Sequence, residues 1–288
     1  MAGMEFGGGL SSRIECRGGV AFEQAFEDFV EAVDTTRVAA LVIGRWGEVS
    51  HADGYPGRLL AENAERFPAL RALFLGGGDG DEIVYIEHAD LTPILDAYPG
   101  LEELWVRGTP DLSQESPRHF DAMRHTGLRR LVLQSGGLHP EAIRALSECD
   151  LPELRHLELY LGHPDWCGWA EPEDLAWLLA GGTFPQLEHL GIRNSLIQDE
   201  IAAALAHAPI VAGLRVLDLS LGALGDDGGE ALLHGQPLDH LAALDLHHHY
   251  FSEAMQDRLR TAWPGVDVDL SWHRTADESG RRYVGIGA

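Results

Sequence analysis

The sequence predicts an α/β protein built as an open arc, with a parallel sheet on its concave face and helices on its convex face. Two observations lead to this prediction. A short apolar pattern recurs along most of the chain, and helix-like stretches alternate with it. One strand and one helix cannot bury both of their apolar faces alone, whereas stacked copies bury them against each other.

The recurring pattern is LxxLxL or a close aliphatic variant, and its eight clear copies start 26 to 33 residues apart. A ninth and weaker copy, GVDVDL, starts at Gly265. We expect the copies to form one continuous parallel sheet in chain order, because each repeat returns the chain to the same edge. The clear copies are VAALVI from Val38, LRALFL from Leu70, LEELWV from Leu101, LRRLVL from Leu128, LRHLEL from Leu154, LEHLGI from Leu187, LRVLDL from Leu214 and LAALDL from Leu241.

Turn and helix signals separate these strands. Proline-containing turns precede several of them, as in Phe67-Pro68. Ser252 is placed to cap the start of a helix, because its side chain can accept a hydrogen bond from the first turn. The clearest helix-like stretches cover residues 199–208, 228–235 and 252–262.

Two copies extend into longer motifs: LRVLDLSLGALGDDGGEALL, residues 214–233, and LEHLGIRNSLIQDEIAAALA, residues 187–206. They resemble the LxxLxLxxNxLxDxGxxxL unit of leucine-rich repeat proteins of the ribonuclease-inhibitor-like α/β class. This resemblance implies a leucine-rich repeat solenoid shaped as a horseshoe or arc. The whole chain also resembles a bacterial leucine-rich repeat family common in actinomycetes, which is associated with gene neighbourhoods encoding radical-SAM-type enzymes. Neither resemblance implies an established activity.

The chain departs from that family at the position where asparagine is usual. Main-chain groups that an asparagine ladder would satisfy must therefore find other partners, such as Thr109, Ser195, His249 or water. We expect looser and more irregular turns as a result. The nine residues at this position are Trp46, Gly78, Thr109, Gly136, Gly162, Ser195, Gly222, His249 and His273.

The repeats divide the chain into three regions. Residues 38–270 carry about eight to nine repeats. Residues 1–37 do not, but residues 21–33 place phenylalanine and valine at helical spacing, which indicates an amphipathic helix in an N-terminal cap. We expect residues 271–288 to close the other end as a C-terminal cap and then to fray.

Charge and composition narrow the class of partner. The formal net charge of the 288 residues is -25, and so acidic a surface repels nucleic acid and anionic membranes. The longest apolar stretches are far shorter than the about 18 to 20 residues of a membrane span. We therefore expect neither nucleic acid nor membrane as a partner. The charge serves solubility, or it favours a partner with basic residues.

Cysteine usage and the N-terminus bear on location. Cys16, Cys149 and Cys167 are an odd number without CxxC spacing, which indicates free thiols in a reducing compartment. The first residues lack the charged start and apolar run of a signal peptide. We therefore expect a cytoplasmic protein.

Side chains of neighbouring strands should form columns on the concave face. Odd positions of each LxxLxL copy face away from the leucine core, and equivalent positions of successive strands lie about 4.8 Å apart. The fifth positions are apolar from Val42 to Val132 and acidic at Asp218, Asp245 and Asp269. We expect Trp105, Tyr160 and Arg193 to be at least partly exposed there. The expected ligand-binding residues are Trp105, Arg107, Glu158, Tyr160, Arg193, Asp218, Asp245, His247, Asp267 and Asp269.

The three histidines of LDLHHHYF, residues 244–251, follow the last clear strand. His247 should face the concave surface, His248 lies at the strand exit and His249 falls on the asparagine position. They diverge, so three ligands to one ion are not expected. The acidic column beside them, in which like charges are unfavourable, is a solvated face, a site for a basic ligand or a cation site.

Two loops complete the set of sites that we considered. GGGDGDE, residues 76–82, has glycines but no lysine for phosphate, so we expect a flexible loop. Trp166 and Trp169 lie in a long repeat, where they either anchor a partner or fold back onto the arc. His163 with Cys167 is a weak signal for zinc or catalysis, because a second cysteine pair and a partner base are absent.

These patterns predict a non-catalytic module that binds a protein or peptide on its concave face, without a cofactor and without catalytic residues. Nucleophile motifs, paired glycosidase carboxylates and dinucleotide fingerprints are absent from the sequence. Two alternatives stay open. One is a metal-dependent enzyme or metal-binding protein centred on Asp218, Asp245 and His247. The other is a scaffold for neighbouring biosynthetic enzymes.

Overall fold

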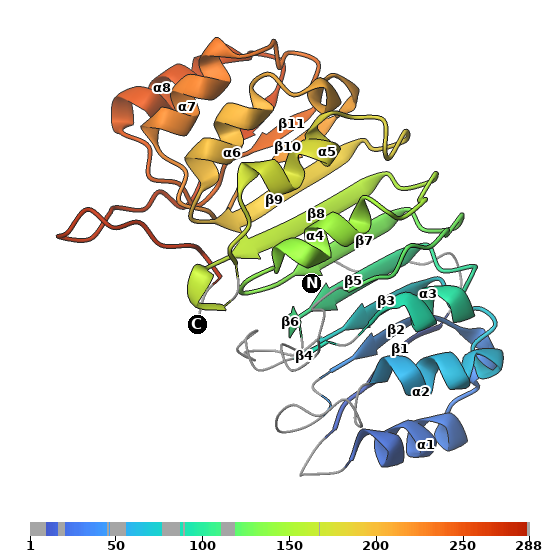
Figure 1. The fold of residues 1–288 in the computed structure, drawn as a ribbon. Helices are drawn as coiled ribbons and strands as arrows, with labels where there is room; N and C mark the ends of the chain where they lie inside the picture. The colour runs from blue at the N-terminus through green and yellow to red at the C-terminus, as the bar shows by residue number, and fades with distance from the viewer. Residues whose placement is uncertain are drawn as a thin grey trace.

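The chain folds around one ten-stranded parallel sheet whose strands follow chain order (Figure 1). The computed structural model describes residues 10–16, 21–44, 46, 56–76, 87–88, 90–110, 119–166 and 168–286. All eight clear LxxLxL copies contribute a strand, so the predicted continuous sheet is confirmed. The strands are β1 (Leu10–Ile14), β2 (Val38–Ile43), β3 (Ala72–Leu75), β5 (Glu103–Arg107), β7 (Arg130–Gln134), β8 (His156–Gly162), β9 (His189–Ser195), β10 (Val216–Asp218), β11 (Ala243–Asp245) and β12 (Asp267–Asp269).

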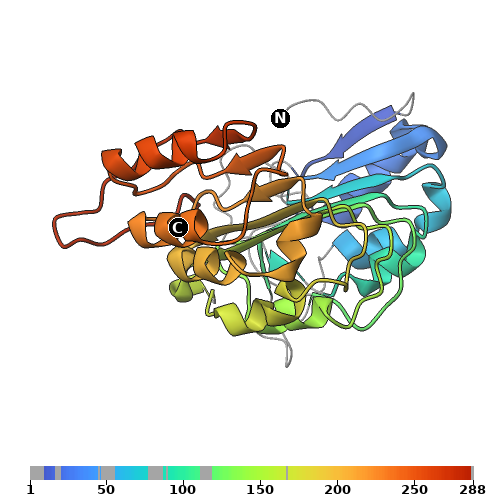
Figure 2. The ribbon, with the colours of Figure 1, turned by 90° about the horizontal axis from the view of Figure 1, so that it is seen from above.

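Helices cover the outer face of this sheet, and Figure 2 shows the strands on the inner side of a curved arc. Ser252 caps α8 as expected, since its Oγ accepts a hydrogen bond from Met255 N at 3.2 Å. A small second sheet pairs β4 (Glu87–His88) with β6 (Thr109–Pro110). The α-helices are α1 (Phe22–Ala32), α2 (Pro56–Glu62), α3 (Thr92–Ala97), α4 (Pro140–Leu146), α5 (Ala176–Leu179), α6 (Gln198–Leu205), α7 (Asp226–His234) and α8 (Glu253–Ala262). Short 3-10 helices are η1 (Thr35–Arg37), η3 (Ala64–Arg66), η5 (Pro164–Trp166), η6 (Pro172–Leu175) and η7 (Pro209–Gly213).

The strand register matches the register read from the repeats. Trp105 pairs with Val132, which pairs with Glu158, and Asp218 pairs with Asp245. The fourth positions point the other way, into the space between sheet and helices, where each buried leucine contributes roughly 1.5 to 3 kcal/mol. Every member of that row is at most 2 % exposed: Leu41, Leu73, Leu104, Leu131, Leu157, Leu190, Leu217 and Leu244.

The N-terminal end of the arc holds the predicted amphipathic helix. Helix α1 buries Phe22 and Phe26, and the ring of Phe26 lies 6.0 Å from that of Phe67. Strand β1 was not predicted. It pairs in parallel with β2 and so adds one strand beyond the repeats that the sequence pattern marks.

The turns after the last strands use left-handed backbone at one equivalent position. Asn194, Leu221, His248 and Trp272 all have φ between 56° and 66°, which is uncommon for residues other than glycine. At the following position, Ser195 Oγ accepts from Ile197 N at 3.2 Å. His249 Nδ1 similarly accepts from Phe251 N at 3.2 Å. Both side chains accept a hydrogen bond from the main chain of their own turn, at two of the positions where asparagine is usual in the family.

The C-terminal tail does not fray as far as residue 286, and that expectation is wrong for these residues. The tail leaves the arc as the red loop of Figure 1 and returns along the end of β9 and the loops that follow β10 and β11. Tyr283 N donates to Tyr250 Oη at 2.8 Å, and Ile286 N donates to Asn194 Oδ1 at 2.8 Å. Main-chain hydrogen bonds of this kind are independent of side-chain hydropathy, so the sequence pattern did not predict them.

The described part of the chain has no helix long and apolar enough to cross a membrane. Cys16 and Cys149 are free thiols, and Cys149 is buried. Cys167 lies outside the described residues.

Candidate functional site

The concave face divides into buried and exposed side chains. Trp105 and Arg193 are partly exposed, as predicted. Tyr160 is only 4 % exposed, so the prediction is wrong for this residue. The cause is the neighbouring strand, because the Arg193 guanidinium lies over the Tyr160 ring at 4.8 Å from its centroid.

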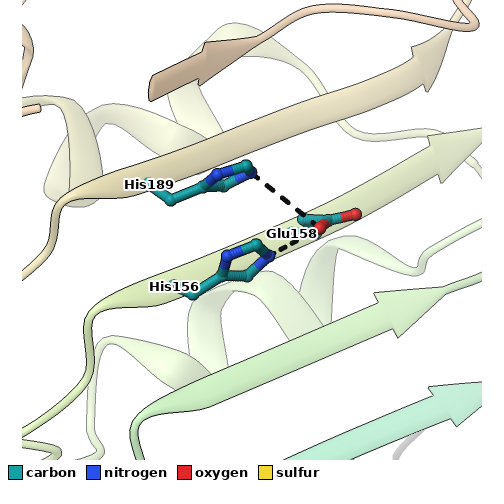
Figure 3. A group of neighbouring side chains, drawn as sticks. All are labelled: His156, Glu158 and His189. Carbon is teal, nitrogen blue, oxygen red and sulfur yellow. Dashed lines mark hydrogen bonds and ion pairs between the residues drawn. The ribbon is translucent and has the colours of Figure 1, made fainter. Parts of the chain in front are cut away.

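A buried carboxylate organises the middle of the face. Glu158 Oε1 accepts from His156 Nε2 at 2.5 Å (Figure 3). Its Oε2 accepts from Arg193 Nη1 at 2.7 Å. The Tyr160 hydroxyl donates to Oε2 at 3.3 Å, and Arg130 Nη2 lies 3.5 Å from Oε1. We call these five residues the Glu158 network. Because Glu158 is 5 % exposed, it orders its neighbours and is screened from a ligand.

Arg193 links this network to the acidic column. Its Nε lies 3.1 Å from Asp218 Oδ2 and donates to Ser220 Oγ at 3.0 Å. Asp218 is 5 % exposed and accepts from Ser220 N at 2.9 Å. The Arg193 guanidinium therefore bridges Glu158 on β8 and Asp218 on β10. Both carboxylates were expected to bind a ligand, but they pair with Arg193 inside the protein.

Burial and charge act on the two carboxylates in opposite directions. Burial alone raises the pKa of Glu158, but the hydrogen bond from His156 and the charge of Arg193 outweigh it and hold the pKa at about 2. Burial likewise raises the pKa of Asp218, and Arg193 only partly offsets that effect, so its pKa stays above the ordinary value. Glu158 is therefore the firmly ionised member of the pair.

Two histidines on adjacent strands flank Glu158. The rings of His156 and His189 stack at 3.7 Å between centroids, and the Nε2 atoms of both point toward the same carboxylate (Figure 3). His189 Nε2 is 3.9 Å from Glu158 Oε1, too far for a hydrogen bond. Burial and the charge of His156 lower the pKa of His189 to about 4. His189 is therefore neutral in the folded protein at pH 7.

Acidification is expected to weaken the fold in two windows. His189 has a folded pKa of about 4 against 6.5 when unperturbed, so its contribution, complete above pH 6.5, is lost as pH falls toward 4. Glu158 has a folded pKa of about 2 against 4.5, so its contribution is lost between pH 4.5 and 2. Urea unfolding at several pH values should show His189→Asn flattening the upper window by up to about 1.4 kcal/mol per pH unit. Equal slopes in both proteins would contradict this.

The acidic end of the face lies on β11 and β12. Asp245 Oδ1 is 2.7 Å from His247 Nδ1 and also accepts from His247 N. Asp267 and Asp269 are exposed, and Trp272 packs its ring edge to face at 5.1 Å from that of His247. Burial opposes ionisation of Asp245, but the bonds from His247 prevail and lower its pKa. Negative charge is therefore maintained here in contact with solvent.

The other two histidines of the run have separate roles, as predicted. His248 is buried at the left-handed turn, with its ring 6.0 Å from that of Tyr250. His249 is fully buried; its ring stacks at 4.7 Å on Phe251, and its Nε2 lies 3.0 Å from Leu270 O. The run is structural apart from His247.

Two groups of described residues have nitrogen and oxygen atoms close enough to share a cation. The first is His156, Glu158 and His189, and the second is Asp245, His247 and Asp269. Two arginines already neutralise Glu158, which opposes a cation at the first group. The second group has a ligand set suited to a divalent ion, but Asp269 stands where the sequence analysis expected Asp218.

The N-terminal half of the face is aromatic and apolar. The rings of Phe74 and Trp105 stack at 4.9 Å, and Trp105 Nε1 donates to Gln134 Oε1 at 3.3 Å. A small apolar cluster, separate from the main core, joins this half to the tail; its members are Val132, Tyr160, Leu221, Trp105 and Ile286. Arg107 lies at the end of β5 and is partly exposed.

The sequence analysis omitted Arg130, His156 and His189 from the expected site. All three occupy the third-position column, where positive or titratable side chains stand on three successive strands. That column was the available signal. Asn194 was also missed, and no local pattern marks it.

The two loops differ in how much is described. Trp169 is 55 % exposed and packs edge to face on His139 at 5.8 Å, whereas Trp166 is half-buried in η5. The possibility that both fold back onto the arc does not hold for Trp169. Residues 77–82 of the glycine-rich loop lie outside the described part.

Comparison with known proteins informs the fold. A protein of Bacteroides fragilis has a solved structure that matches with a TM-score of 0.81 at 25% sequence identity, over 96% of this chain and 77% of that chain. An internalin from Listeria monocytogenes matches with a TM-score of 0.40 at 16% identity, over 84% and 63% of the two chains, which is too distant to support an argument.

The sequence matches none of the known family profiles. It also matches none of the curated proteins. The resemblance to an actinomycete family therefore stays a prediction. The single parallel sheet of repeated LxxLxL strands, with helices on its outer face, makes the chain an α/β leucine-rich repeat solenoid.

Proposed function

We propose that the concave face binds a protein or peptide and that the chain is not an enzyme. One observation carries this proposal: a single uninterrupted sheet face presents a partly exposed aromatic pair, Phe74 and Trp105, and exposed carboxylates, Asp267 and Asp269. Flat or concave faces with separate apolar and charged areas suit a macromolecular partner better than a small substrate.

The acidic end selects for basic residues in the partner. Asp245, Asp267 and Asp269 lie on adjacent strands, so their potentials add in front of the sheet. Glu158, Tyr160 and Asp218 support this surface by ordering Arg193, and they do not contact the partner. The metal-centred alternative has less support, because Asp218 pairs with Arg193 and lies away from a shared cation position.

A charge-removal series tests the proposal. Asp245→Asn, Asp267→Asn and Asp269→Asn together should weaken binding of a labelled nona-arginine peptide at least tenfold at low salt, mainly through slower association. Asparagine keeps an Oδ1 acceptor for His247 N. The matched control replaces Asp227, Asp239 and Glu253, which are exposed outside the concave columns, by their amides.

Stopped-flow fluorescence at two salt concentrations measures both rates. The control changes the net charge equally and should change affinity less than threefold. Affinity capture from the host's extract with mass spectrometry should then recover one protein that the control retains and the concave variant loses. Equal weakening in the two variants would show that only net charge matters, and the proposal would be wrong.

A further inference from the structure

The last described residues of the chain bind the arc as an extended peptide. Residues 281–286, here the returning segment, use their main-chain atoms in hydrogen bonds to the end of β9 and to the loops after β10 and β11. Gly285 N donates to Leu221 O at 2.6 Å. The Tyr250 hydroxyl donates to Tyr283 O at 2.9 Å and accepts from Tyr283 N at 2.8 Å. Three successive repeats thus hold one strand-like segment.

Asn194 has the chemistry of a main-chain clamp. Its Nδ2 donates to Ile286 O at 2.7 Å, and its Oδ1 accepts from Ile286 N at 2.8 Å. Asn194 is fully buried, and its amide makes both of these bonds to the returning segment. A side-chain amide that donates and accepts in this way matches any peptide unit in extended conformation. If the segment left, the Asn194 amide would lose both of these partners.

Two side chains of the segment provide specificity. Arg282 Nη1 donates to Asp199 Oδ2 at 2.7 Å and to Ala223 O at 3.0 Å. The guanidinium lies against Gly225, where a Cβ would overlap it. Ile286 joins the apolar cluster on the concave face, which includes Tyr160. The contacts of the arginine and the apolar seat of the isoleucine are therefore separated by three residues of chain.

The position before the aliphatic residue favours a small side chain. A Cβ on Gly285 would lie 2.8 Å from Leu221 Cδ2 and 3.3 Å from His248 Cδ2. Contacts this short disfavour larger side chains, because the Leu221 side chain would have to shift to admit them. The groove therefore favours the order arginine, two variable residues, glycine and an aliphatic residue, which the returning segment has as RYVGI, residues 282–286.

We infer that this groove, formed by Asn194, Asp199, Leu221 and Tyr250, is a peptide-binding site for extended segments of the Arg-x-x-Gly-aliphatic type, and that the chain's own C-terminal segment occupies it until a partner's segment replaces it. The inference rests on the proposed function, because it specifies which part of a partner the concave side recognises. A partner with arginine and an aliphatic residue also matches the acidic and apolar parts of that side.

The test uses the full chain and a labelled peptide, GRRYVGI amide. Ile286→Asp places a charge in the apolar seat and should release the segment. Release should raise the hydrogen-exchange rates of the main-chain amides at Gly285 and at position 286. Because an attached competitor acts at an effective concentration of about millimolar, the released variant should bind the peptide at least tenfold more tightly than the unchanged protein. Fluorescence anisotropy measures both affinities.

Two controls define the chemistry. Adding Asp199→Asn to Ile286→Asp should weaken peptide binding at least tenfold; asparagine retains Oδ1, which accepts from Gly225 N and Gly228 N, while removing the charge that binds Arg282. A peptide with glutamate in place of its second arginine should not bind. Light scattering should show a monomer, because a dimer would mean that segments exchange between copies, which would overturn the inference.

Failure is distinguishable from failure of the proposed function. If exchange at Gly285 and at position 286 rises in Ile286→Asp but the peptide does not bind, the groove is only a packing site for the tail and the inference is wrong. The nona-arginine experiment uses Asp245, Asp267 and Asp269. Asp245 bonds to His247 and Asp269 bonds to Ser271, outside residues 281–286, so the result of that experiment stands independently.

Discussion

Replacing Gly162 by alanine is expected to lower the free energy of unfolding by about 3 kcal/mol or more. Gly162 ends β8 with a φ of 74°, and a Cβ there would overlap the carbonyl of Gly136 in the adjacent loop. The obstacle is backbone, held by the hydrogen bond from His163 N to Gly136 O at 2.8 Å, so it cannot move aside as a side chain would. The backbone strain of a positive φ and the overlap with the Gly136 carbonyl therefore both lower the free energy of unfolding.

Gly182 provides a matched control. It has a φ of 91°, and a Cβ there would meet no atom within 4 Å. Gly182→Ala should therefore cost only the left-handed strain, about 1 kcal/mol. Urea unfolding followed by circular dichroism compares the two variants. Equal losses would mean that the loops after β7 and β8 relax around the added methyl group, and that the close backbone packing is not needed.

The second large effect is expected at Glu158. Glu158→Gln removes the charge that Arg193 and His156 contact, leaving a mostly buried guanidinium with Asp218 as its remaining carboxylate. Breaking a buried ion pair from one side costs about 3 kcal/mol or more, because the remaining charge loses part of its compensation. Tyr160 also loses an acceptor of full charge. We therefore expect a loss of about 3 kcal/mol in the free energy of unfolding.

A surface pair immediately before the same two strands, β8 and β9, serves as the control. Arg155 Nη1 and Glu188 Oε1 are 3.1 Å apart, with both side chains nearly half exposed. Glu188→Gln should cost less than about 1 kcal/mol. Combining Glu158→Gln with Arg193→Met should lower the free energy of unfolding by less than the sum of the two single changes, because each single change leaves a charged group without one of its partners. Additive costs would show that Glu158 and Arg193 are not energetically coupled.

The sequence predicted the sheet and its register because period and alternation are local properties. A six-residue pattern says which residues face the helices, and stacking then determines which residues share a column. Val132, Glu158 and Gly191 are neighbours in the structure for this reason alone. The same logic missed β1, because Leu10–Ile14 lacks the leucine spacing that marked the other strands.

Side-chain pairing within a column could not be predicted from position. The register placed Tyr160 beside Arg193, but only the length of the arginine and the position of Glu158 decide that the guanidinium covers the ring. The path of the C-terminal tail could not be predicted from the sequence for another reason. Asn194 and Ile286 are 92 residues apart, and the bonds between them join the Asn194 side chain to main-chain atoms of Ile286 that every residue has.

The returning segment changes how the solenoid comes apart. In a stack where each repeat contacts only its neighbours, terminal repeats unfold one at a time from the end. Here the segment after β12 is fastened to Asn194 at the end of β9, three strands inward. The repeats of β10, β11 and β12 therefore lie inside a closed loop of chain, and none of them detaches before that fastening opens. The C-terminal end of the arc thus behaves as a single cooperative unit, and binding at the groove is linked to its integrity.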